Sequence, residues 1–398
     1  MKVLQINSVC GIRSTGRICT DIADILTREG HECRIAWGRE AVPPQFQQYA
    51  VRVGRFAEVL AHGGKARLFD AAGLGSVAAT RRFVKWIKAY DPDVIHIHNI
   101  HEYYINFKVL FQYLKQSGKP VVWTLHDCWS FTGHCTYFDI YRCERWKTGC
   151  GDCPQRKNYP KSLFFDRSAR NFELKKRYCA TLPDLTLVPP SKWLGGLLEQ
   201  SLFAEGPARI RVINNGIDLN SFSPTPSNFR EKNGLEGKKI LLGVANPWGE
   251  RKGLDDFLYL REHLGEEYAI VLVGLSPEQR DALPEGILGN LRTNSVKELA
   301  QIYTAADIFL NPTYEDNYPT VNMEAQACGT PVITYRTGGS PENVDPASGV
   351  IVERGDRAAL LDAVQRFLPR PVQGAECFDK NLRFREYIEL YRELCGEK

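Results

Sequence analysis

Two carboxylates lie close together in the C-terminal half of the chain, within the segment EDNYPTVNMEAQACGTPVI. Asp316 and Glu324 are separated by seven residues, in text typical of a loop that leads into a helix. The start of such a helix offers N–H groups and a positive dipole end, which suit an anion. Carboxylates suit sugar hydroxyls, because they accept hydrogen bonds. A phosphate and a polyol together make a nucleotide-sugar, although a loop acid and a surface helix acid would show the same spacing.

Two cations stand at the start of another predicted helix. Arg251 and Lys252, in the segment ERKGLDDF, follow the strand predicted in KKILLGVAN. Paired cations at this place can neutralise a diphosphate leaving group. A surface position is the alternative, but a cation at a helix N-terminus opposes the helix dipole, which favours a functional role.

The first strand of the chain is followed by the glycine-containing segment CGIRSTGRI. Gly16 would let the backbone approach a phosphate, and Arg17 would add positive charge. A glycine turn is also common in ordinary connections. This segment therefore predicts a second donor-binding element only in combination with other motifs.

Histidines follow two further predicted strands. In HIHNIH we expect His98, Asn99 and His101 to hydrogen-bond an acceptor, and His96 to occupy a partly buried strand position. Metal binding is the alternative suggested by the ligand type. His126 and Asp127 end the strand predicted in PVVWTLHD.

A cysteine-rich segment follows that strand. A Cys-x-x-Cys pair with two upstream cysteines fits a structural zinc site, and two disulfides or four packed thiols are the alternatives. The segment has little regular apolar periodicity, so it needs a further interaction, such as a bound metal or a disulfide, to hold it together. The four predicted ligands are Cys135, Cys143, Cys150 and Cys153.

The chain alternates short β-rich runs with helical stretches, which predicts an α/β protein with parallel, doubly wound sheets. At 398 residues two domains are expected, and the Asn-, Ser- and Pro-rich text near residue 220 is typical of a linker. We predict domains over residues 1–220 and 221–398, with the cysteine-rich insertion at about 128–165. The sequence pattern does not decide to which of these two domains the last helix belongs. Ligands of such sheets bind beyond the carboxyl ends of the strands, and we expect the two domains to face each other across a cleft.

Charge is divided unevenly between these halves. Residues 1–220 carry 31 Lys and Arg against 20 Asp and Glu, whereas the remainder carries 20 against 27. The basic half predicts an anionic partner, and a solvated charged face is the alternative. No apolar run approaches the ~18 residues of a membrane span, so a cytoplasmic location is expected. Membrane docking is predicted for the helical text ATRRFVKWIKAY, whose Arg81, Arg82, Lys85 and Lys88 lie beside Phe83, Val84, Trp86 and Ile87.

The acid-pair segment resembles the signature of the retaining glycosyltransferases of family 4, which have the GT-B fold. The motif NNGID, at residues 214–218, resembles another motif of that family, and the likeness extends along nearly the whole chain. Two departures are visible: Asp316 stands where the family more often has Glu, and the family's earlier loop Arg is replaced by Asn246 or Pro247. The resemblance implies that Glu324 holds the ribose, that Asp316 touches the donor sugar, and that His126 contacts the sugar or its phosphate. It also implies that phosphates or sugar meet the backbone N–H groups of Tyr318, Thr320 and Val321.

The resemblance implies a reaction that needs no catalytic metal. A hexose-type sugar would pass from a nucleotide-diphosphate donor to a lipid-linked or oligosaccharide acceptor hydroxyl, in exopolysaccharide, capsule or lipopolysaccharide synthesis. A similar cysteine-rich insertion occurs in bacterial family members that build surface polysaccharides. The alternative is a nucleotide-sugar epimerase on the same fold. A zinc-dependent nucleic-acid binder is a third hypothesis, which leaves the second half unexplained and lacks a concentrated Lys/Arg run.

Overall fold

The computed structural model describes residues 1–368 and 370–396, which form two compact units. The first unit comprises Met1–Asn214 and the chain from Phe384 onward, and the second comprises Asn215–Arg383. The division therefore lies a few residues before the expected position near 220. The last helix, α13 (Lys380–Cys395), begins in the second unit and returns to the first, which the sequence had left open.

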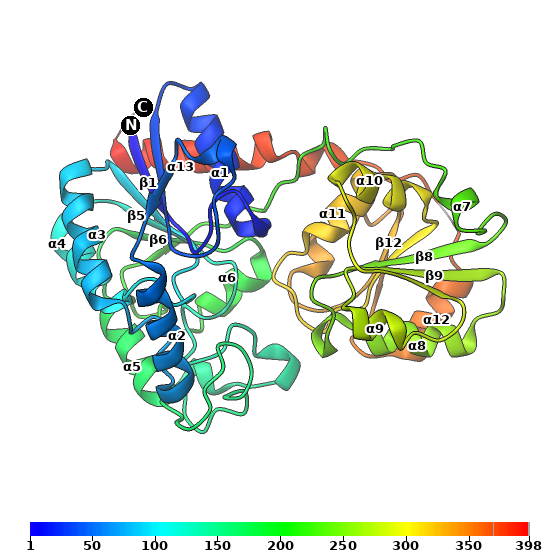
Figure 1. Cartoon of the computed structure of the whole chain (residues 1–398), viewed down its shortest axis with the longest axis horizontal. Coiled ribbons are helices and arrows are strands. Elements are labelled where there is room, and N and C mark those ends of the chain that lie inside the picture. Colours follow the sequence, from blue (N-terminus) through cyan, green and yellow to red (C-terminus); the bar gives the residue numbers. More distant parts are fainter. Residues whose placement is uncertain (369, 397–398) are drawn as a thin grey trace. The chain divides into compact units, whose positions relative to one another are not determined.

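The first unit is built on a parallel sheet with the strand order β3-β2-β1-β4-β5-β6-β7. Figure 1 labels β1, β5 and β6 of this sheet. Its strands are β1 (Lys2–Ile6), β2 (Glu32–Trp37), β3 (Ala50–Arg52), β4 (Val94–Ile97), β5 (Val121–Thr124), β6 (Leu185–Val188) and β7 (Arg209–Ile210). Its helices are α1 (Arg13–Arg28), α2 (Phe56–Phe69), α3 (Val77–Tyr90), α4 (Phe107–Ser117), α5 (Ser168–Tyr178), α6 (Lys192–Leu198) and most of α13.

The second unit is built on another parallel sheet, with the order β10-β9-β8-β11-β12-β13. Its strands are β8 (Lys239–Val244), β9 (Tyr268–Val273), β10 (Ile287–Asn290), β11 (Ile308–Asn311), β12 (Val332–Tyr335) and β13 (Val350–Val352). Its helices are α7 (Phe229–Lys232), α8 (Leu254–His263), α9 (Pro277–Asp281), α10 (Val296–Ala305), α11 (Thr320–Ala327) and α12 (Arg357–Gln365).

These sheets confirm the predicted α/β class, and the burial of their strands explains the sequence pattern. Every residue of β4, β5 and β9 is buried, because helices cover both faces of a parallel sheet. The strands therefore appear as continuous apolar runs. Strand order reverses between β1 and β4 in the first sheet, and between β8 and β11 in the second. In parallel sheets of this kind, ligands bind at such switch points, in the crevice beyond the carboxyl ends of the strands.

The cysteine-rich insertion connects β5 to α5 and has a hydrophobic core of its own. Phe138 packs on Trp146 with ring centroids 4.9 Å apart, and Phe131 packs on Trp146 at 5.3 Å. Buried Lys175, on α5, donates hydrogen bonds to the carbonyl oxygens of Trp129 and Thr132. The aromatic cluster supplies a staple that the sequence pattern had not indicated.

Helix α2 was not predicted, because its sequence carries Gly63 and Gly64 and no clear apolar stripe. Several of its apolar side chains are exposed, among them Phe56 and Leu60. Among the described residues, no helix combines the length and the apolar character needed to cross a lipid bilayer.

Candidate active site

The switch point of the second sheet brings the two predicted cations to Asp316. Arg251 and Lys252 lie in a short 3-10 helix, Glu250–Lys252, that follows β8, and Asp316 lies in the loop after β11. Lys252 Nζ donates to Asp316 Oδ2 at 2.6 Å. Arg251 Nη1 lies 3.6 Å from the same oxygen and donates to the carbonyl of Glu315 at 2.6 Å. One carboxylate therefore holds both cations.

Charge and burial act against each other in this cluster. Burial alone would raise the pKa of Asp316, but the charges of Lys252 and Arg251 outweigh it and hold that pKa below its ordinary value. Burial lowers the pKa of Lys252, although Asp316 opposes the shift. The neighbouring Glu315 is completely buried, so it does not share the partly exposed position of Asp316.

Glu324 lies on α11, half-buried, and is held by a residue from α10. The hydroxyl of Tyr303 donates to Glu324 Oε2 at 3.0 Å, and Tyr303 is itself fully buried. Thr320 and Val321 are the first two residues of α11, and Pro319 precedes them as an N-cap that provides no side-chain hydrogen bond. The N-terminus of α11 thus lacks the side-chain acceptor that usually caps a helix.

A third loop shapes the surroundings of Asp316. Gly338 has φ +54°, and a Cβ there would lie 1.9 Å from the carbonyl oxygen of Asp316, so only glycine fits. Asn343 donates to the carbonyl of Pro319 at 2.8 Å, just before α11 begins. The backbone N–H of Tyr318 donates to the Asp316 carboxylate, so that amide already has an acceptor in this structure.

In the first unit, Gly16 and Arg17 lie in the first turns of α1. Gly16 is buried, and a Cβ there would meet the Val9 side chain at 3.1 Å and the Gly11 nitrogen at 3.2 Å. The glycine therefore serves the close packing of α1 against the turn after β1. Arg17 is exposed on the helix surface.

A chain of hydrogen bonds runs from β1 to His126. Gln5 Nε2 donates to the carbonyl of Cys19 at 2.8 Å, which turns Gln5 Oε1 toward His98 Nε2 at 3.1 Å. His98 must donate to that oxygen, so its Nδ1 accepts from His126 Nε2 at 3.0 Å. This assigns His126 as the tautomer that carries its proton on Nε2. Burial lowers the pKa of His126 to about 4, so the ring is neutral near pH 7.

His98 was expected to face an acceptor, but it is 1% exposed and both its ring nitrogens are engaged in this chain. Its position is therefore that of a residue behind His126. His96 is completely buried rather than partly buried, and its nitrogens contact Tyr391 OH at 2.6 Å and Thr124 Oγ1 at 2.8 Å.

His101 forms a buried ion pair that the sequence did not indicate. Its Nε2 lies 2.8 Å from Asp127 Oδ2, and its Nδ1 lies 3.2 Å from the hydroxyl of Tyr159. Burial would lower the pKa of His101, but Asp127 outweighs it and raises that pKa above the ordinary value. Asn99 stands nearby in the sequence, and its backbone N–H donates to Asn7 at 3.2 Å. His98, Asn99, His101, His126 and Asp127 line one pocket.

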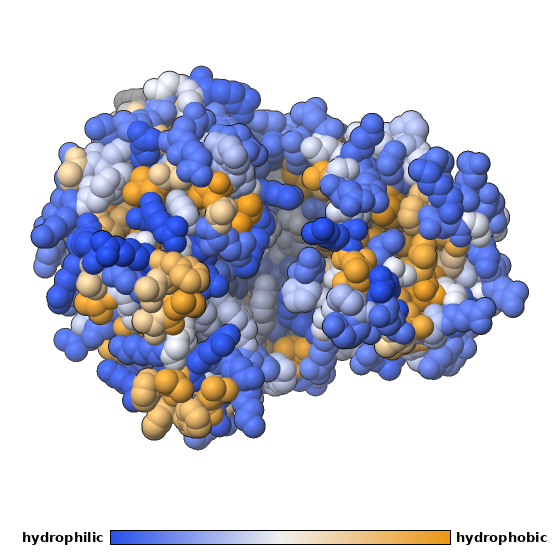
Figure 2. Space-filling view, in the orientation of Figure 1, coloured by the Kyte–Doolittle hydropathy of each residue, from blue (hydrophilic) through white to orange (hydrophobic). Residues whose placement is uncertain are grey.

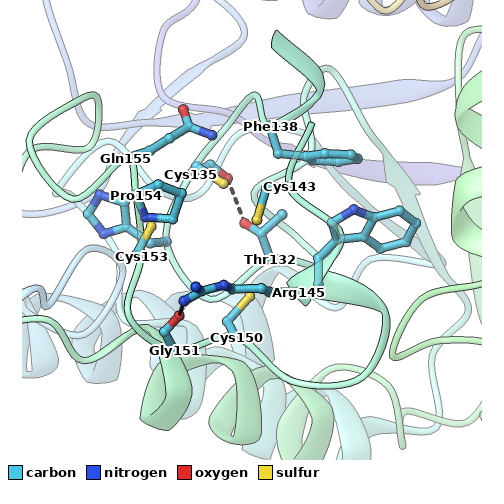
Figure 3. A pocket seen from close by; sticks show the side chains of 12 residues that line it. Thr132, Cys135, Phe138, Cys143, Arg145, Cys150, Gly151, Cys153, Pro154 and Gln155 are labelled. Carbon is cyan, nitrogen blue, oxygen red and sulfur yellow. Dashed lines mark hydrogen bonds between the residues drawn. The ribbon is translucent and has the colours of Figure 1, made fainter. Parts of the chain in front are cut away.

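A second pocket in the first unit is lined by the predicted zinc ligands, and Figure 3 shows their side chains around it: Cys135, Cys143, Cys150 and Cys153. The backbone N–H of Gly133 donates to Cys150 Sγ at 3.1 Å. Burial raises the pKa of Cys153 to about 12, against the hydrogen bond from the N–H of Gln155. No cysteine among the described residues forms a disulfide.

The zinc prediction stays a prediction. Among the residues that the structure describes, no three His, Cys, Asp or Glu side chains are gathered as a set that could hold a metal ion. This holds also for the histidines after β4, where metal binding was an alternative to hydrogen bonding.

The sequence did not indicate Tyr303, Gln5 and Gly338 as residues of the site. It also did not indicate that Asp127 pairs with His101. Tyr303 and Gln5 belong to ordinary apolar segments, and nothing in those segments indicates their partners. Gly338 stands in the segment TGGS, whose glycine pair indicates a special backbone conformation.

Models of known protein families match both halves of the chain. The model of Glycosyltransferase Family 4 matches residues 15–221, more than half of the chain, and that of Glycosyl transferases group 1 matches residues 238–369. The chain belongs to glycosyltransferase family 4. The family 4 chain is 25% identical to the putative colanic acid biosynthesis glycosyl transferase WcaC of Escherichia coli K12, over 99% of this chain and 100% of that one.

Solved structures confirm that this family 4 enzyme has the GT-B fold. Sucrose-phosphate synthase from Thermosynechococcus elongatus aligns over 99% of both chains with a TM-score of 0.71 and 17% identity. HepE of Anabaena, solved in complex with UDP and glucose, aligns over 98% of this chain and 99% of its own with a TM-score of 0.63 and 16% identity. The predicted transferase activity is confirmed at the level of the family, and none of these matches supports the epimerase alternative.

Proposed function

We propose that the protein is a retaining glycosyltransferase that moves a hexose-type sugar from a nucleotide-diphosphate donor to an acceptor hydroxyl. The acceptor would be a lipid-linked sugar or oligosaccharide at the cytoplasmic face of the membrane, and the product a surface polysaccharide. The observation that carries the proposal is the joint hold of Asp316 on Lys252 and Arg251, next to the start of α11.

The cations would serve the leaving group. Loss of a nucleoside diphosphate leaves negative charge on a phosphate oxygen, and preorganised cations stabilise charge that develops there. Lys252 has three N–H donors and gives one to Asp316, so it can offer others to a diphosphate while it stays in place. No metal is then required for this step.

The ribose would be held by Glu324, which the Tyr303 hydroxyl orients from behind. A half-buried carboxylate that accepts hydroxyl protons gives charge-assisted hydrogen bonds, the stronger kind. His126, neutral and held by His98, would hydrogen-bond the donor sugar or its phosphate without adding charge. The departing phosphate oxygen would take the acceptor proton, so the acceptor attacks from the face that the leaving group vacates and the anomeric configuration is retained.

Two relatives support the choice of substrates. WcaC is named for colanic acid biosynthesis, and HepE was solved with UDP and with UDP-glucose. We infer from them a polysaccharide product and a nucleotide-diphosphate-sugar donor for this chain.

A two-step experiment tests the proposal. A thermal-shift screen across nucleotide-sugars should find a donor that raises the melting temperature, since a ligand stabilises the state that binds it. Release of the nucleoside diphosphate should then depend on an added lipid-linked or oligosaccharide acceptor and persist in the presence of a chelator, and NMR of the product should show the anomeric configuration of the donor. Sugar-nucleotide turnover without any acceptor, or an inverted product, would contradict it.

A further inference from the structure

Exposed apolar side chains gather where the end of α2 meets the insertion. Figure 2 shows hydrophobic side chains at the foot of the first unit, in the region where Figure 1 places α2 and the insertion. We call this set the aromatic tip. It consists of Leu68, Phe69, Leu163, Phe164 and Phe165, which are 40%, 38%, 44%, 66% and 47% exposed.

Ring stacking and hydrogen bonds hold the residues of the aromatic tip in place. The rings of Phe69 and Phe165 stack with centroids 5.6 Å apart, and the Leu163 N–H donates to the carbonyl of Arg67 at 2.7 Å. Arg156 Nη1 donates to the carbonyl of Phe164 at 2.7 Å, so the backbone behind that ring is fixed. Phe164 is nevertheless the most exposed member. The fold thus exposes a cluster of large apolar side chains to water. The surfaces of soluble proteins rarely carry such clusters.

Positive charge lies beside the aromatic tip. The Arg167 guanidinium lies 5.6 Å from the ring centre of Phe69 and 5.5 Å from that of Phe165. Residues 156–170 carry five cations against one carboxylate, and the cations are Arg156, Lys157, Lys161, Arg167 and Arg170. The carboxylate, Asp166, accepts hydrogen bonds from the Cys153 and Ser168 N–H groups. The tip therefore combines exposed apolar side chains with two cations that contact it, Arg156 and Arg167, and its own stretch of sequence is basic.

From this arrangement we propose that the aromatic tip docks the protein on an anionic lipid bilayer. Aromatic side chains enter the boundary between headgroups and acyl chains, while Lys and Arg contact the anionic headgroups. A second copy of the chain is a poorer occupant, because stacking two tips would bring their cations together. The inference does not depend on the proposed sugar substrates.

The structure separates this surface from the membrane helix predicted in the sequence. That helix is α3, and its Trp86 is half-buried, stacked on Tyr90 at 5.0 Å and on Phe83 at 6.0 Å. Arg82 pairs with Glu58 at 2.7 Å. Helix α3 therefore presents cations without an exposed aromatic ring to insert, whereas the aromatic tip presents both.

Vesicle co-sedimentation of the full chain tests the proposal. We expect binding to phosphatidylcholine vesicles that contain phosphatidylglycerol, little binding to phosphatidylcholine alone, and weaker binding as salt rises. The double variant Leu163→Ser, Phe164→Ser should bind roughly tenfold or more weakly, since each apolar side chain adds burial free energy. The matched control is Leu382→Ser, which removes an apolar side chain of similar exposure, 53%, from the second unit.

A second pair of variants keeps the test decisive. Lys157→Gln with Lys161→Gln should lower binding to anionic vesicles without touching the apolar side chains. Charge neutralisation on α3, at Arg81 and Lys85, should leave most of the binding. The proposal would be overturned by equal binding to both vesicle types or to neither, by loss in the α3 variant alone, or by a serine double variant that binds normally. A shift from dimer to monomer in that variant, without a change in lipid binding, would instead assign the tip to self-association.

Discussion

Lys252 Nζ lies 2.6 Å from Asp316 Oδ2, and this contact joins the loop after β8 to the loop after β11 across the switch point of the second sheet. The pair is 64 residues apart in the chain and both side chains are 16% exposed. The contact fixes a cation beside the N-terminus of a helix, where a diphosphate would find two kinds of positive potential. The first prediction rests on this pair.

Replacing Lys252 by glutamine should lower kcat by roughly 10²–10³, the usual effect of removing one group that stabilises developing charge. Steady-state kinetics with the identified donor measure it. Lys297→Gln is the control, because Lys297 is an exposed lysine on α10 in the same unit. If Lys252→Gln raised only KM and left kcat unchanged, the lysine would bind the donor without acting on the leaving group.

Glu324→Gln keeps the shape of the side chain but removes charge-assisted hydrogen bonds of about 1.5–3 kcal/mol. Donor affinity measured by calorimetry should therefore fall by roughly one to two orders of magnitude. Tyr303→Phe, which removes the hydroxyl behind Glu324, should give a smaller loss in the same direction. Unchanged donor binding in Glu324→Gln would exclude the carboxylate from the ribose site.

The His101–Asp127 pair predicts a pH-dependent contribution to stability. The folded pKa of His101 lies above its ordinary 6.5, so its contribution is complete below that value and is lost as pH rises through the folded pKa. The folded pKa of Asp127 lies below its ordinary 3.8, so its contribution is present above that value and is lost as pH falls. The pair therefore stabilises the fold most between these two ordinary values.

His101→Gln should cost about 3–5 kcal/mol where the pair is charged, as expected when a buried ion pair loses one partner. Denaturant unfolding of the variant and the natural chain should show this difference near pH 6 and a smaller one near pH 9. The comparison cancels the opposite effect of neutral, buried His96 and His126, which disfavour folding in acid. A difference that grew with pH would show that His101 is not charged in the folded state.

If the cysteines of the insertion bind zinc, the purified protein should carry about one metal per chain, the load of a single four-ligand site. Elemental analysis measures it, and Cys150→Ser should lose the metal. Cys377→Ser is the control, because Cys377 is exposed and lies in the second unit. Metal-free protein whose thiols titrate readily would leave the cluster of Phe131, Phe138 and Trp146 as the staple of the insertion.

Local signals in the sequence determined the α/β class, the alternation of strands and helices, and the motifs at the strand ends. The acid pair, the Arg251–Lys252 pair and the start of α11 could be located this way, because loop chemistry and apolar period act over a few residues. Helix α2 was not predicted, because its sequence lacks a clear apolar stripe. A role for its exposed Phe69 could be proposed only once the structure placed that ring against Phe165 of the insertion.

The tertiary structure decided which of these residues meet. Gln5 reaches His98 across 93 residues, Tyr303 reaches Glu324 from another helix, and His96 contacts Tyr391 across 295 residues. Such partners depend on how strands are ordered in a sheet and on where the last helix returns, which no short stretch encodes. The same long-range packing turned His98 from an expected acceptor ligand into a buried support for His126, because burial and hydrogen-bond completion are properties of the assembled unit.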